Sequence, residues 1–476
     1  MKIKIFMAAS AVVGLLVASS FIYQDKDSVK QLVKEPGFKI DTLATGLIVP
    51  WQITFLPDGA MLFTERAGRV RLYRGGKLLP EPVFTVEDVA ADRKMGLLGL
   101  ALHPDFKKNN YVYVASNYTE QGDMKLKVLR YVFKGGKLQK PLTVIEGIPA
   151  NQNHTGCRLV FGPDRKLYIT AGDADKPAQA QDLKALNGKI LRVSDDGSIP
   201  ADNPFAKNDT ARKQIWSYGH RNPQGLVFQP GTNILFDTEH GPTGGDEVNI
   251  IHKGENYGWP IIHHRDTRAG MNTPLLEYTP SIGPGEAMFY NGNAFSELKG
   301  DLLVACLRGE GILHIKLKGT KVVSQGMLFK KQFGRIRSLV TGPDGSLYLS
   351  TSMIDEPESR SSSPFDMIIR ISSIGKQHNF PAQPIAGNTV LANARPTTPQ
   401  LFQQLCAACH GDKLQGTEKT KALLGGNFAH GSDKKSIVNN ITNGITEKGM
   451  PAWGGAVSAA DIDKLADFIL VTSKKQ

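Results

Sequence analysis

Leu159-Val-Phe-Gly-Pro-Asp-Arg-Lys-Leu-Tyr-Ile-Thr170 consists of an apolar strand, a tight turn and a second apolar strand. Pro163 fixes the backbone angle φ for the turn and Asp164 tolerates the bend, so the stretch predicts a β-hairpin. The pattern returns almost unchanged at Leu339-Val-Thr-Gly-Pro-Asp-Gly-Ser-Leu-Tyr-Leu-Ser350. A hairpin motif that recurs so closely indicates an internal structural repeat.

Six stretches in total follow this pattern, and the other four begin at Gln52, Leu98, Leu226 and Ala294. Their spacing of roughly 45 to 70 residues suits a four-stranded propeller blade with variable loops. A β-sandwich could contain similar hairpins, but two sandwiches would not explain one recurring motif. The sequence therefore predicts an all-β six-bladed β-propeller over residues 36–373.

The C-terminal region contains Cys406-Ala-Ala-Cys409-His410, in which two thiols bind a c-type haem covalently and the histidine ligates its iron. A zinc site would need two further soft ligands, and this region has no other cysteine. Met450 lies in a Gly/Pro-containing loop typical of the sixth haem ligand, and His430 is the rival. We expect covalent haem c, with His410 and Met450 on the iron.

Helix signals surround these ligands. A Thr-Pro pair at Thr398 and a box formed by Ser458 and Asp461 predict two helix starts, each followed by apolar residues at helical spacing. Residues 398–476 are thus expected to form a small all-α cytochrome c domain. The segment 374–397 is rich in proline without apolar periodicity, which predicts a linker.

The N-terminus has two lysines followed by the uncharged apolar run Ile5–Tyr23. Residues 1–23 therefore predict either a cleaved signal peptide or an uncleaved membrane anchor, and c-type haem attachment itself requires export. We expect a periplasmic or exported protein, soluble or tethered to the membrane. The two remaining cysteines, Cys157 and Cys306, can pair or stay free.

The net charge of +12 comes from lysines and arginines scattered along the chain. No nucleic-acid motif accompanies them, so we expect no nucleic-acid partner. The charge is typical of a basic exported protein kept soluble by repulsion.

Polar residues occur where propeller loops should meet at one mouth of the central channel. His154 precedes a predicted strand, as a general base at a pocket wall would. Arg221 and Asn222 place a guanidinium beside an amide, suited to polarising a carbonyl or binding a carboxylate. Arg335 and Arg337 are two residues apart in a predicted strand and so share a face, which suggests an anion with several carboxylates.

The turn Glu239-His-Gly-Pro-Thr-Gly-Gly-Asp-Glu247 is rich in glycine and flanked by acidic residues. Its exposed carbonyl oxygens could hold a hard cation such as Ca²⁺.

From about Gly46 to Ile371 the chain resembles the soluble quinoprotein glucose and aldose sugar dehydrogenases. These are six-bladed propellers that use pyrroloquinoline quinone (PQQ) and Ca²⁺. The resemblance rests on motifs at residues 96–106, 154–164, 219–225, 239–242 with 246–247, 256–260 and 335–337.

The resemblance implies that His154 takes the proton of the sugar hydroxyl while hydride passes to the C5 carbonyl of PQQ. It implies that Arg221 polarises that carbonyl, that Asn222 also touches the cofactor, and that the carbonyls of Gly241 and Pro242 coordinate Ca²⁺.

It further implies that Arg335 and Arg337 hold PQQ carboxylates. Glu247 and Tyr257 match the place where relatives bind a second, structural Ca²⁺.

This chain departs from those relatives at two positions. Lys94 stands where they have glutamine, and Arg308 stands near the position of their lysine. Both changes keep or add positive charge opposite an anionic cofactor, and both are expected to contact PQQ. The loop 281–286 lacks the aromatic wall of glucose-preferring members and is similar to the broad-specificity aldose type.

We therefore predict PQQ- and Ca²⁺-dependent oxidation of an aldose to its lactone. The electrons would pass to the fused haem and on to another cytochrome or a quinone-linked carrier. The alternatives are a lactonase-type propeller hydrolase and a non-enzymatic binding propeller, each carrying a cytochrome c. A lactonase would need several carboxylates on its metal, and the combination of His154, Arg221, Arg335 and Arg337 argues against a mere binding module.

Overall fold

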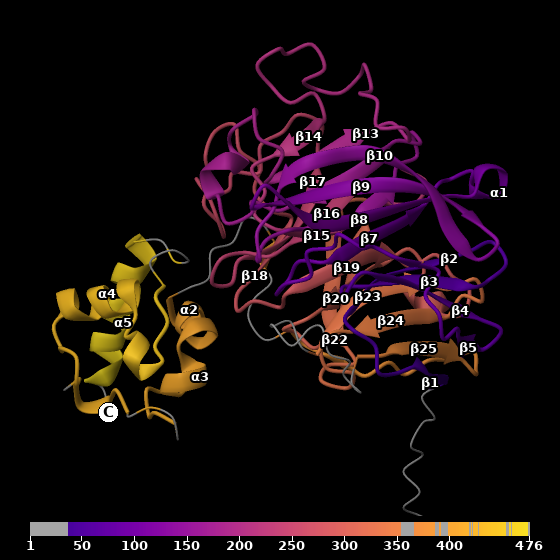
Figure 1. Cartoon of the computed structure of the whole chain (residues 1–476). Helices are drawn as coiled ribbons and strands as arrows, with labels where there is room; N and C mark the ends of the chain where they lie inside the picture. Colours follow the sequence, from indigo (N-terminus) through magenta and orange to yellow (C-terminus); the bar gives the residue numbers. More distant parts are fainter. Residues whose placement is uncertain are drawn as a thin grey trace, which may run out of the picture.

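The computed structural model describes residues 37–353, 366–385, 390–391, 398–417, 420, 422–426, 428–453, 457 and 459–474. Within these residues the chain forms a disc of radiating sheets with a small helical domain beside it (Figure 1). The predicted N-terminal segment, residues 1–23, lies outside the described residues. Among the described residues, no helix is both long and apolar enough to cross a membrane.

The disc contains six antiparallel sheets, which confirms the predicted six-bladed propeller. Blade 1 has β2 Pro50–Phe55, β3 Met61–Glu65, β4 Arg69–Arg74 and β5 Lys77–Leu78, with β6 Phe84–Thr85 also on β4. Blade 2 has β7 Leu97–Leu102, β8 Tyr111–Glu120, β9 Asp123–Lys134 and β10 Lys137–Pro149. Blade 3 has β11 Leu159–Phe161, β12 Leu167–Ala171, β13 Lys189–Val193 and β14 Ile215–Tyr218.

Blade 4 has β15 Pro223–Phe228, β16 Leu235–Glu239, β17 Asp246–Ile251 and β18 Leu276–Tyr278. Blade 5 has β19 Pro284–Phe289, β20 Leu302–Cys306, β21 Gly311–Lys318 and β22 Lys321–Leu328. Blade 6 has β23 Ile336–Thr341, β24 Leu347–Thr351 and β25 Ile368–Ser373, completed by β1 Phe38–Ala44. Short helices α1 Phe106–Asn109 and η1 Pro177–Ala180 lie in loops.

Blade 6 closes the ring because its outermost strand comes from the start of the propeller. β1 pairs with β25, so that Phe38 lies opposite Ser373 and Ile40 opposite Ile371. The two ends of the propeller therefore share one sheet, and backbone hydrogen bonds hold the ring shut.

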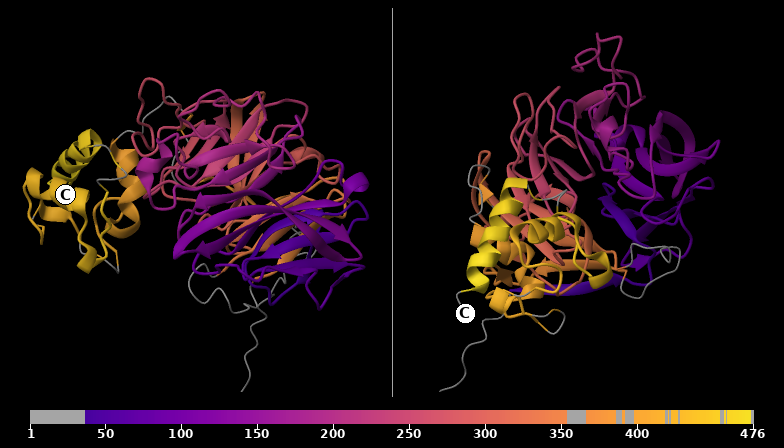
Figure 2. Two further views of the ribbon diagram at one scale, coloured as in Figure 1. Left: turned by 45° about the horizontal axis from the view of Figure 1, so that its top comes forward. Right: turned by 90° about the vertical axis from the view of Figure 1, so that its left-hand side faces the viewer.

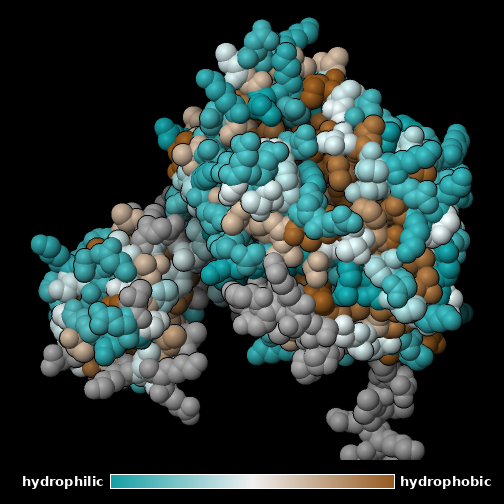
Figure 3. Space-filling model, viewed as in Figure 1, coloured by the Kyte–Doolittle hydropathy of each residue, from teal (hydrophilic) through white to brown (hydrophobic). Residues whose placement is uncertain are grey.

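The apolar core lies between neighbouring blades. One buried cluster joins Trp51 of blade 1, Leu98 and Tyr113 of blade 2, and Leu159 and Ile169 of blade 3. Middle strands such as β3, β12 and β20 are buried along their whole length, because each is covered by a blade on both faces. The outer surface is mostly hydrophilic in the view of Figure 3.

Five of the six quoted repeats form the expected hairpins, and the one beginning at Ala294 does not. There the innermost strand is β19, and Ser296–Leu298 forms the 3-10 helix η2. The Tyr290 hydroxyl accepts a hydrogen bond from the Phe295 N–H and donates to the Gly345 carbonyl. These bonds and the burial of Phe295 hold the segment as a turn rather than a strand.

Part of the predicted linker is attached to the propeller. β26 Ala382–Gln383 pairs with β22 at the edge of blade 5, and β27 Val390–Leu391 pairs with β18 at the edge of blade 4. Before them, the Phe380 ring stacks on Phe38 with a centroid separation of 5.3 Å.

The C-terminal domain is built from α2 Thr398–Leu405, α3 Ala407–His410, η4 Leu424–Gly426, α4 Lys434–Asn443, η5 Thr446–Lys448 and α5 Ala459–Ser473. Its small core includes Phe402, Ile437, Ile462 and Leu465. Both predicted helices are present as α2 and α5, whereas the predicted cap Ser458 lies outside the described residues. The left view in Figure 2 shows this domain beside the propeller.

Candidate active site

The candidate propeller residues lie in loops or at the ends of strands at one mouth of the channel. His154, Arg221 and Arg335 precede the innermost strands β11, β15 and β23. The 239–247 turn and Arg308 follow the second strands β16 and β20. In an antiparallel sheet the start of one strand and the end of its neighbour lie at the same edge, so these loops meet.

His154 is oriented by a buried carboxylate. Its Nδ1 lies 2.8 Å from Asp173 Oδ1 and 3.0 Å from Asp175 Oδ1. Asp173 is fully buried, whereas the His154 side chain is 18% exposed. In neutral imidazole, an Nδ1 proton donated to a carboxylate leaves the Nε2 lone pair available as a base.

A second donor connects this pair to the next blade. Trp259 Nε1 donates to Asp173 Oδ2 at 2.7 Å, and the Arg221 guanidinium lies over the Trp259 ring at 5.3 Å from its centroid. Gly172 permits this approach, because a Cβ there would lie 2.0 Å from the His154 carbonyl oxygen. One chain of contacts therefore joins the candidate base to Arg221.

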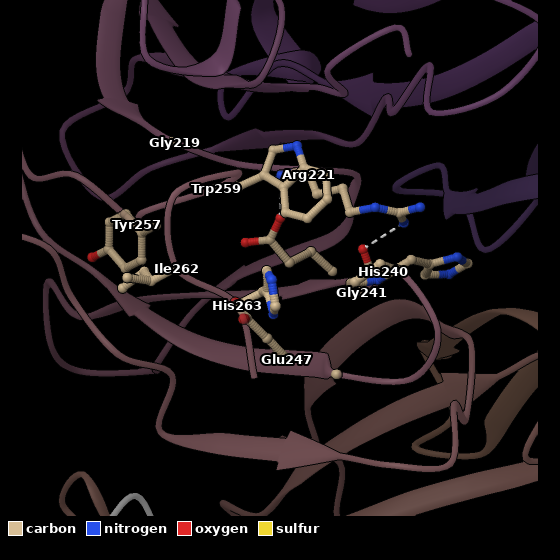
Figure 4. A pocket seen from close by; sticks show the side chains of 12 residues that line it. Gly219, Arg221, His240, Gly241, Glu247, Tyr257, Trp259, Ile262 and His263 are labelled. Atoms are coloured by element: carbon tan, nitrogen blue, oxygen red, sulfur yellow. Dashed lines mark hydrogen bonds between the residues drawn. The ribbon is translucent and has the colours of Figure 1, made fainter. Parts of the chain in front are cut away.

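Arg221 has hydrogen-bond partners, but not for all of its donors. Its backbone N–H donates to Glu239 Oε2 at 2.8 Å. Its Nη1 donates to the His240 carbonyl at 3.0 Å, the hydrogen bond drawn as a dashed line in Figure 4. Its Nε is buried without a hydrogen-bond partner among the described residues. Burial lowers the pKa of this guanidinium, but arginine stays charged in proteins. A buried unpaired donor on a cation fits an anionic or carbonyl-bearing ligand.

Positive charge converges on His240. Its pKa is lowered to about 3, first by burial and then by Arg337, Arg221 and, to a smaller extent, Arg308. Arg337 is buried and donates from Nη1 to Gln224 Oε1 at 3.1 Å. Three of the predicted cations therefore surround one residue at the mouth.

The two remaining predicted cations are Arg335 and Lys94, and the side chain of Arg308 is exposed like that of Lys94. Arg335 is half-buried and its Nε donates to the Ser352 carbonyl at 3.0 Å. Asn222, by contrast, is buried and its Oδ1 accepts from Gln224 Nε2 at 3.3 Å.

The predicted calcium residues line one pocket. Gly241, Pro242, Glu247 and Tyr257 face the same space as Arg221, Glu239, Trp259 and His263, as Figure 4 shows for most of them. A Cβ at Gly241 would lie 2.2 Å from the carbonyl oxygens of Gly244 and Gly245, so the tight turn requires glycine.

Carboxylates cluster at the same pocket, because Glu239 and Glu247 line it and Asp237 lies close to Glu239. Burial, and then the nearby charge of Glu239, raises the pKa of both Glu247 and Asp237 well above the ordinary range. Asn249 Nδ2 donates to Glu239 at 3.1 Å and to Glu247 at 3.0 Å. Oxygen donors with unbalanced negative charge fit a hard divalent cation.

Tyr257 can serve such a cation only through its carbonyl oxygen. Its hydroxyl donates to the Ile250 carbonyl at 2.6 Å and accepts from the His252 N–H at 2.8 Å.

The predicted haem ligands lie around one small core. Cys406, Ala407 and Met450 pack against it, and the two thiols of Cys406 and Cys409 are unbridged. His410 Nδ1 is buried without a partner among the described residues, and burial lowers the pKa of this imidazole. A neutral imidazole is the form that ligates iron. The rival His430 is exposed.

Cys157 and Cys306 are free and fully buried in blades 3 and 5. Burial raises the pKa of both thiols.

Sequence reasoning missed Asp173, Trp259 and Gln224. Asp173 follows the buried strand β12 at the mouth edge, a position that marks candidate polar residues. The other two lie inside the quoted motifs 256–260 and 219–225 but were given no role.

Residues 47–358 match the family model for glucose/sorbosone dehydrogenase, and residues 394–469 match the model for cytochrome c oxidase, cbb3-type, subunit III. The chain is 37% identical over 335 residues to the aldose sugar dehydrogenase YliI of Escherichia coli, covering 66% of this chain and 89% of that protein. Over 75 residues it is 36% identical to the cbb3-type cytochrome c oxidase subunit CcoP of Azospirillum brasilense, covering 14% and 25% respectively.

Among solved structures, the PQQ-bound form of an aldose sugar dehydrogenase from Streptomyces coelicolor superposes with a TM-score of 0.60 at 30% identity. The match covers 70% of this chain and 98% of that one.

Proposed function

Because the chain belongs to the glucose/sorbosone dehydrogenase family of quinoproteins and carries a C-terminal cytochrome c domain, we propose that it oxidises an aldose to its lactone and delivers the electrons to its own haem. The proposed cofactors are PQQ, Ca²⁺ and covalent haem c.

One observation carries the catalytic part of the proposal. His154, Asp173, Trp259 and Arg221 form a continuous chain of contacts from blade 3 to blade 4 at the mouth. It places a base whose Nδ1 faces the carboxylates on the same connected unit as a cation whose buried Nε has no hydrogen-bond partner among the described residues.

Oxidation of an aldose at its anomeric carbon breaks one C–H and one O–H bond, forms a C=O bond and releases two electrons and two protons. In our proposal His154 Nε2 takes the hydroxyl proton, and the Asp173 carboxylate stabilises the resulting imidazolium. PQQ, when bound, supplies the two-electron acceptor. Arg221 stabilises negative charge that develops on a carbonyl oxygen held against its guanidinium.

The residues present fit these cofactors. Arg221, Arg335, Arg337, Lys94 and Arg308 supply the positive charge that a tricarboxylate needs, and Asn222 adds an amide. Gly241 and Pro242 would offer carbonyl oxygens to a Ca²⁺ ion that acts there as a Lewis acid. Glu247 and the Tyr257 carbonyl would hold a second, structural Ca²⁺.

In the C-terminal domain, Cys406 and Cys409 would bind the haem covalently, and His410 and Met450 would ligate its iron. The haem, when bound, supplies a one-electron carrier. An external acceptor, such as another cytochrome or a quinone-linked carrier, would take the electrons onward. Haem attachment of this kind requires export, so we propose a periplasmic or exported location, with residues 1–23 as signal or anchor.

Stopped-flow spectroscopy of protein reconstituted with PQQ and Ca²⁺ tests this proposal. Adding an aldose should reduce the haem and sharpen its visible bands. His154→Ala should slow haem reduction by about 10² to 10⁴, the usual contribution of a general base.

His314→Ala is a matched control. His314 Nε2 lies 2.7 Å from Asp301 Oδ2 and its side chain is 22% exposed, but it is in β21, away from the mouth loops. This variant should reduce its haem at the parent rate.

Equal rates for His154→Ala and the parent would refute the proposed base. A haem that stayed oxidised with every aldose despite bound PQQ would refute the relay. Lactone hydrolysis that needs Ca²⁺ but not PQQ would instead support the hydrolase alternative.

A further inference from the structure

Polar side chains connect blades that are not neighbours across the central channel. Arg337 of blade 6 donates to Gln224 of blade 4 at 3.1 Å. Arg158, beside β11 of blade 3, lies 3.1 Å from Glu286 of blade 5, and Gln52 of blade 1 donates to the same Glu286 at 3.4 Å. None of these pairs belongs to neighbouring blades, so the side chains can meet only inside the ring.

Gln224 differs from the other channel residues in what it contacts. Its Oε1 accepts from Arg337, and its Nε2 donates to the Gly156 carbonyl at 3.2 Å and to Asn222 Oδ1 at 3.3 Å. Asn222 Oδ1 also accepts from the Gly156 N–H at 3.4 Å. A single amide therefore joins blade 6, blade 4 and the loop that carries His154.

The main chain of Gln224 is fixed as well. Its carbonyl oxygen accepts from Arg158 Nε at 3.0 Å. The side chain is only 6% exposed, so no bulk water replaces a lost partner. Gln224 thus has little freedom to move while Arg337 and Asn222 stay in place.

We infer that Gln224 is a positioning residue of the cofactor site. It fixes the Arg337 guanidinium and the Asn222 amide relative to each other from opposite sides of the channel. This inference rests on the proposed function, in which both groups contact PQQ. Without the amide of Gln224 this link between the two groups is lost, and a rigid anion would be bound less tightly by both together.

The test is an equilibrium titration of the full-length holo-cytochrome, without PQQ, with PQQ in the presence of Ca²⁺, followed by tryptophan fluorescence. Gln224→Met removes the amide but keeps the length of the side chain. It should raise the Kd for PQQ by about tenfold or more, since a hydrogen bond to a charged group is lost. Gln224→Asn keeps an amide one methylene short and should give a smaller increase.

Gln52→Met is the matched control. Gln52 is also on an innermost strand, is 5% exposed, and accepts from the Leu100 N–H at 2.9 Å. Its hydrogen bonds to Thr64, Leu100 and Glu286 involve residues that are not proposed to bind PQQ. It should lower the melting temperature about as much as Gln224→Met but change the Kd for PQQ less than threefold.

Parent-like PQQ affinity in either folded Gln224 variant would overturn the inference, and Gln224→Asn decides if Gln224→Met does not fold. Equal weakening by Gln52→Met would also overturn it, because the effect would then be general loosening of the channel. A parent protein that binds no PQQ would overturn the proposed function itself, and with it this inference.

Discussion

Asp173→Asn tests most directly whether a buried carboxylate orients the proposed base His154. The Asp173 carboxylate is buried and takes three donors: His154 Nδ1 at 2.8 Å, the Asp175 N–H at 2.9 Å and Trp259 Nε1 at 2.7 Å. Asparagine has one acceptor oxygen, and its NH₂ group must therefore face a donor. The backbone N–H and the indole N–H cannot change their role.

Two orientations of the asparagine are available, and both impair the base. If its NH₂ faces His154, the imidazole must accept at Nδ1, which moves its proton to Nε2 and removes the lone pair. If its NH₂ faces Trp259, the histidine keeps its tautomer but loses the negative charge that stabilises imidazolium. Each orientation also buries one donor against another.

A charge-assisted hydrogen bond contributes about 1.5–3 kcal/mol, and 1.4 kcal/mol corresponds to tenfold in rate. We therefore expect Asp173→Asn to slow sugar-driven haem reduction by about 100-fold. PQQ affinity should stay near that of the parent, because Asp173 is not among the proposed PQQ contacts.

Asp175→Asn is the matched control. Asp175 lies 3.0 Å from His154 Nδ1, but its side chain is 34% exposed. Ion pairs this exposed contribute about 0.2–1 kcal/mol, so the rate should fall by at most about fivefold. Stopped-flow rates at saturating sugar measure both variants. If the two changes slow the reaction equally, the assignment of Asp173 as the orienting partner is refuted.

Phe380→Ala should lower the free energy of unfolding of the propeller, measured in urea, by about 2 kcal/mol, because the half-buried ring packs on three other phenylalanines. Unchanged stability would mean that the segment around Phe380 is not part of the fold. His103 Nδ1 accepts from the Asp105 N–H at 2.9 Å, and burial lowers the pKa of its imidazole. Between the lowered pKa of folded His103 and about pH 6.5, the folded state therefore binds fewer protons than the unfolded state. His103 thus makes the protein less stable as the pH falls through this range, by at most about 1.4 kcal/mol per pH unit. His103→Gln should flatten this slope in urea titrations at pH 7 and pH 5, and equal slopes would contradict the assignment. Met450→Ala should leave the haem covalently attached but lower its reduction potential, whereas His430→Ala should match the parent in a redox titration; the reverse result would make His430 the ligand.

The sequence predicted the blades where local chemistry decides them. The Pro-Asp turns at Pro163 and Pro343 fix hairpins within a few residues, so their pattern is visible without the fold. The hairpin predicted at Ala294 in blade 5 was wrong. The Tyr290 hydroxyl shapes this segment by accepting from the Phe295 N–H and by donating to the carbonyl of Gly345, which belongs to the next blade. A local pattern cannot report such a contact.

The residues of the candidate site also fall into those that the sequence could predict and those that only the fold reveals. His154, Arg221 and Arg337 could be proposed from residue type and position at a strand start, and the structure brings all three to the mouth. Asp173 could not be singled out, because its loop also contains Asp175 and Asp182. Only the folded path of the loop, with Trp259 as a third partner, decides which carboxylate orients the base.

The strand pairings of the linker limit how far the haem domain can lie from the propeller. Seven residue steps separate Leu391, paired at the edge of blade 4, from Thr398 at the start of α2. At about 3.6 Å per residue they span at most roughly 25 Å. A free chain over the whole predicted linker 374–397 could reach roughly 80 Å by the same measure.

The haem domain is therefore confined to the side of blade 4, the blade whose loops carry Arg221, Glu239 and Gly241. Asp461 of α5 is among the charges that act on Arg265, in the loop after Trp259. Confinement to one side raises the effective concentration of the haem at that blade without any new binding contact. The proposed electron delivery within the chain would thus depend on two short strand pairings in a segment whose composition alone indicated only a linker.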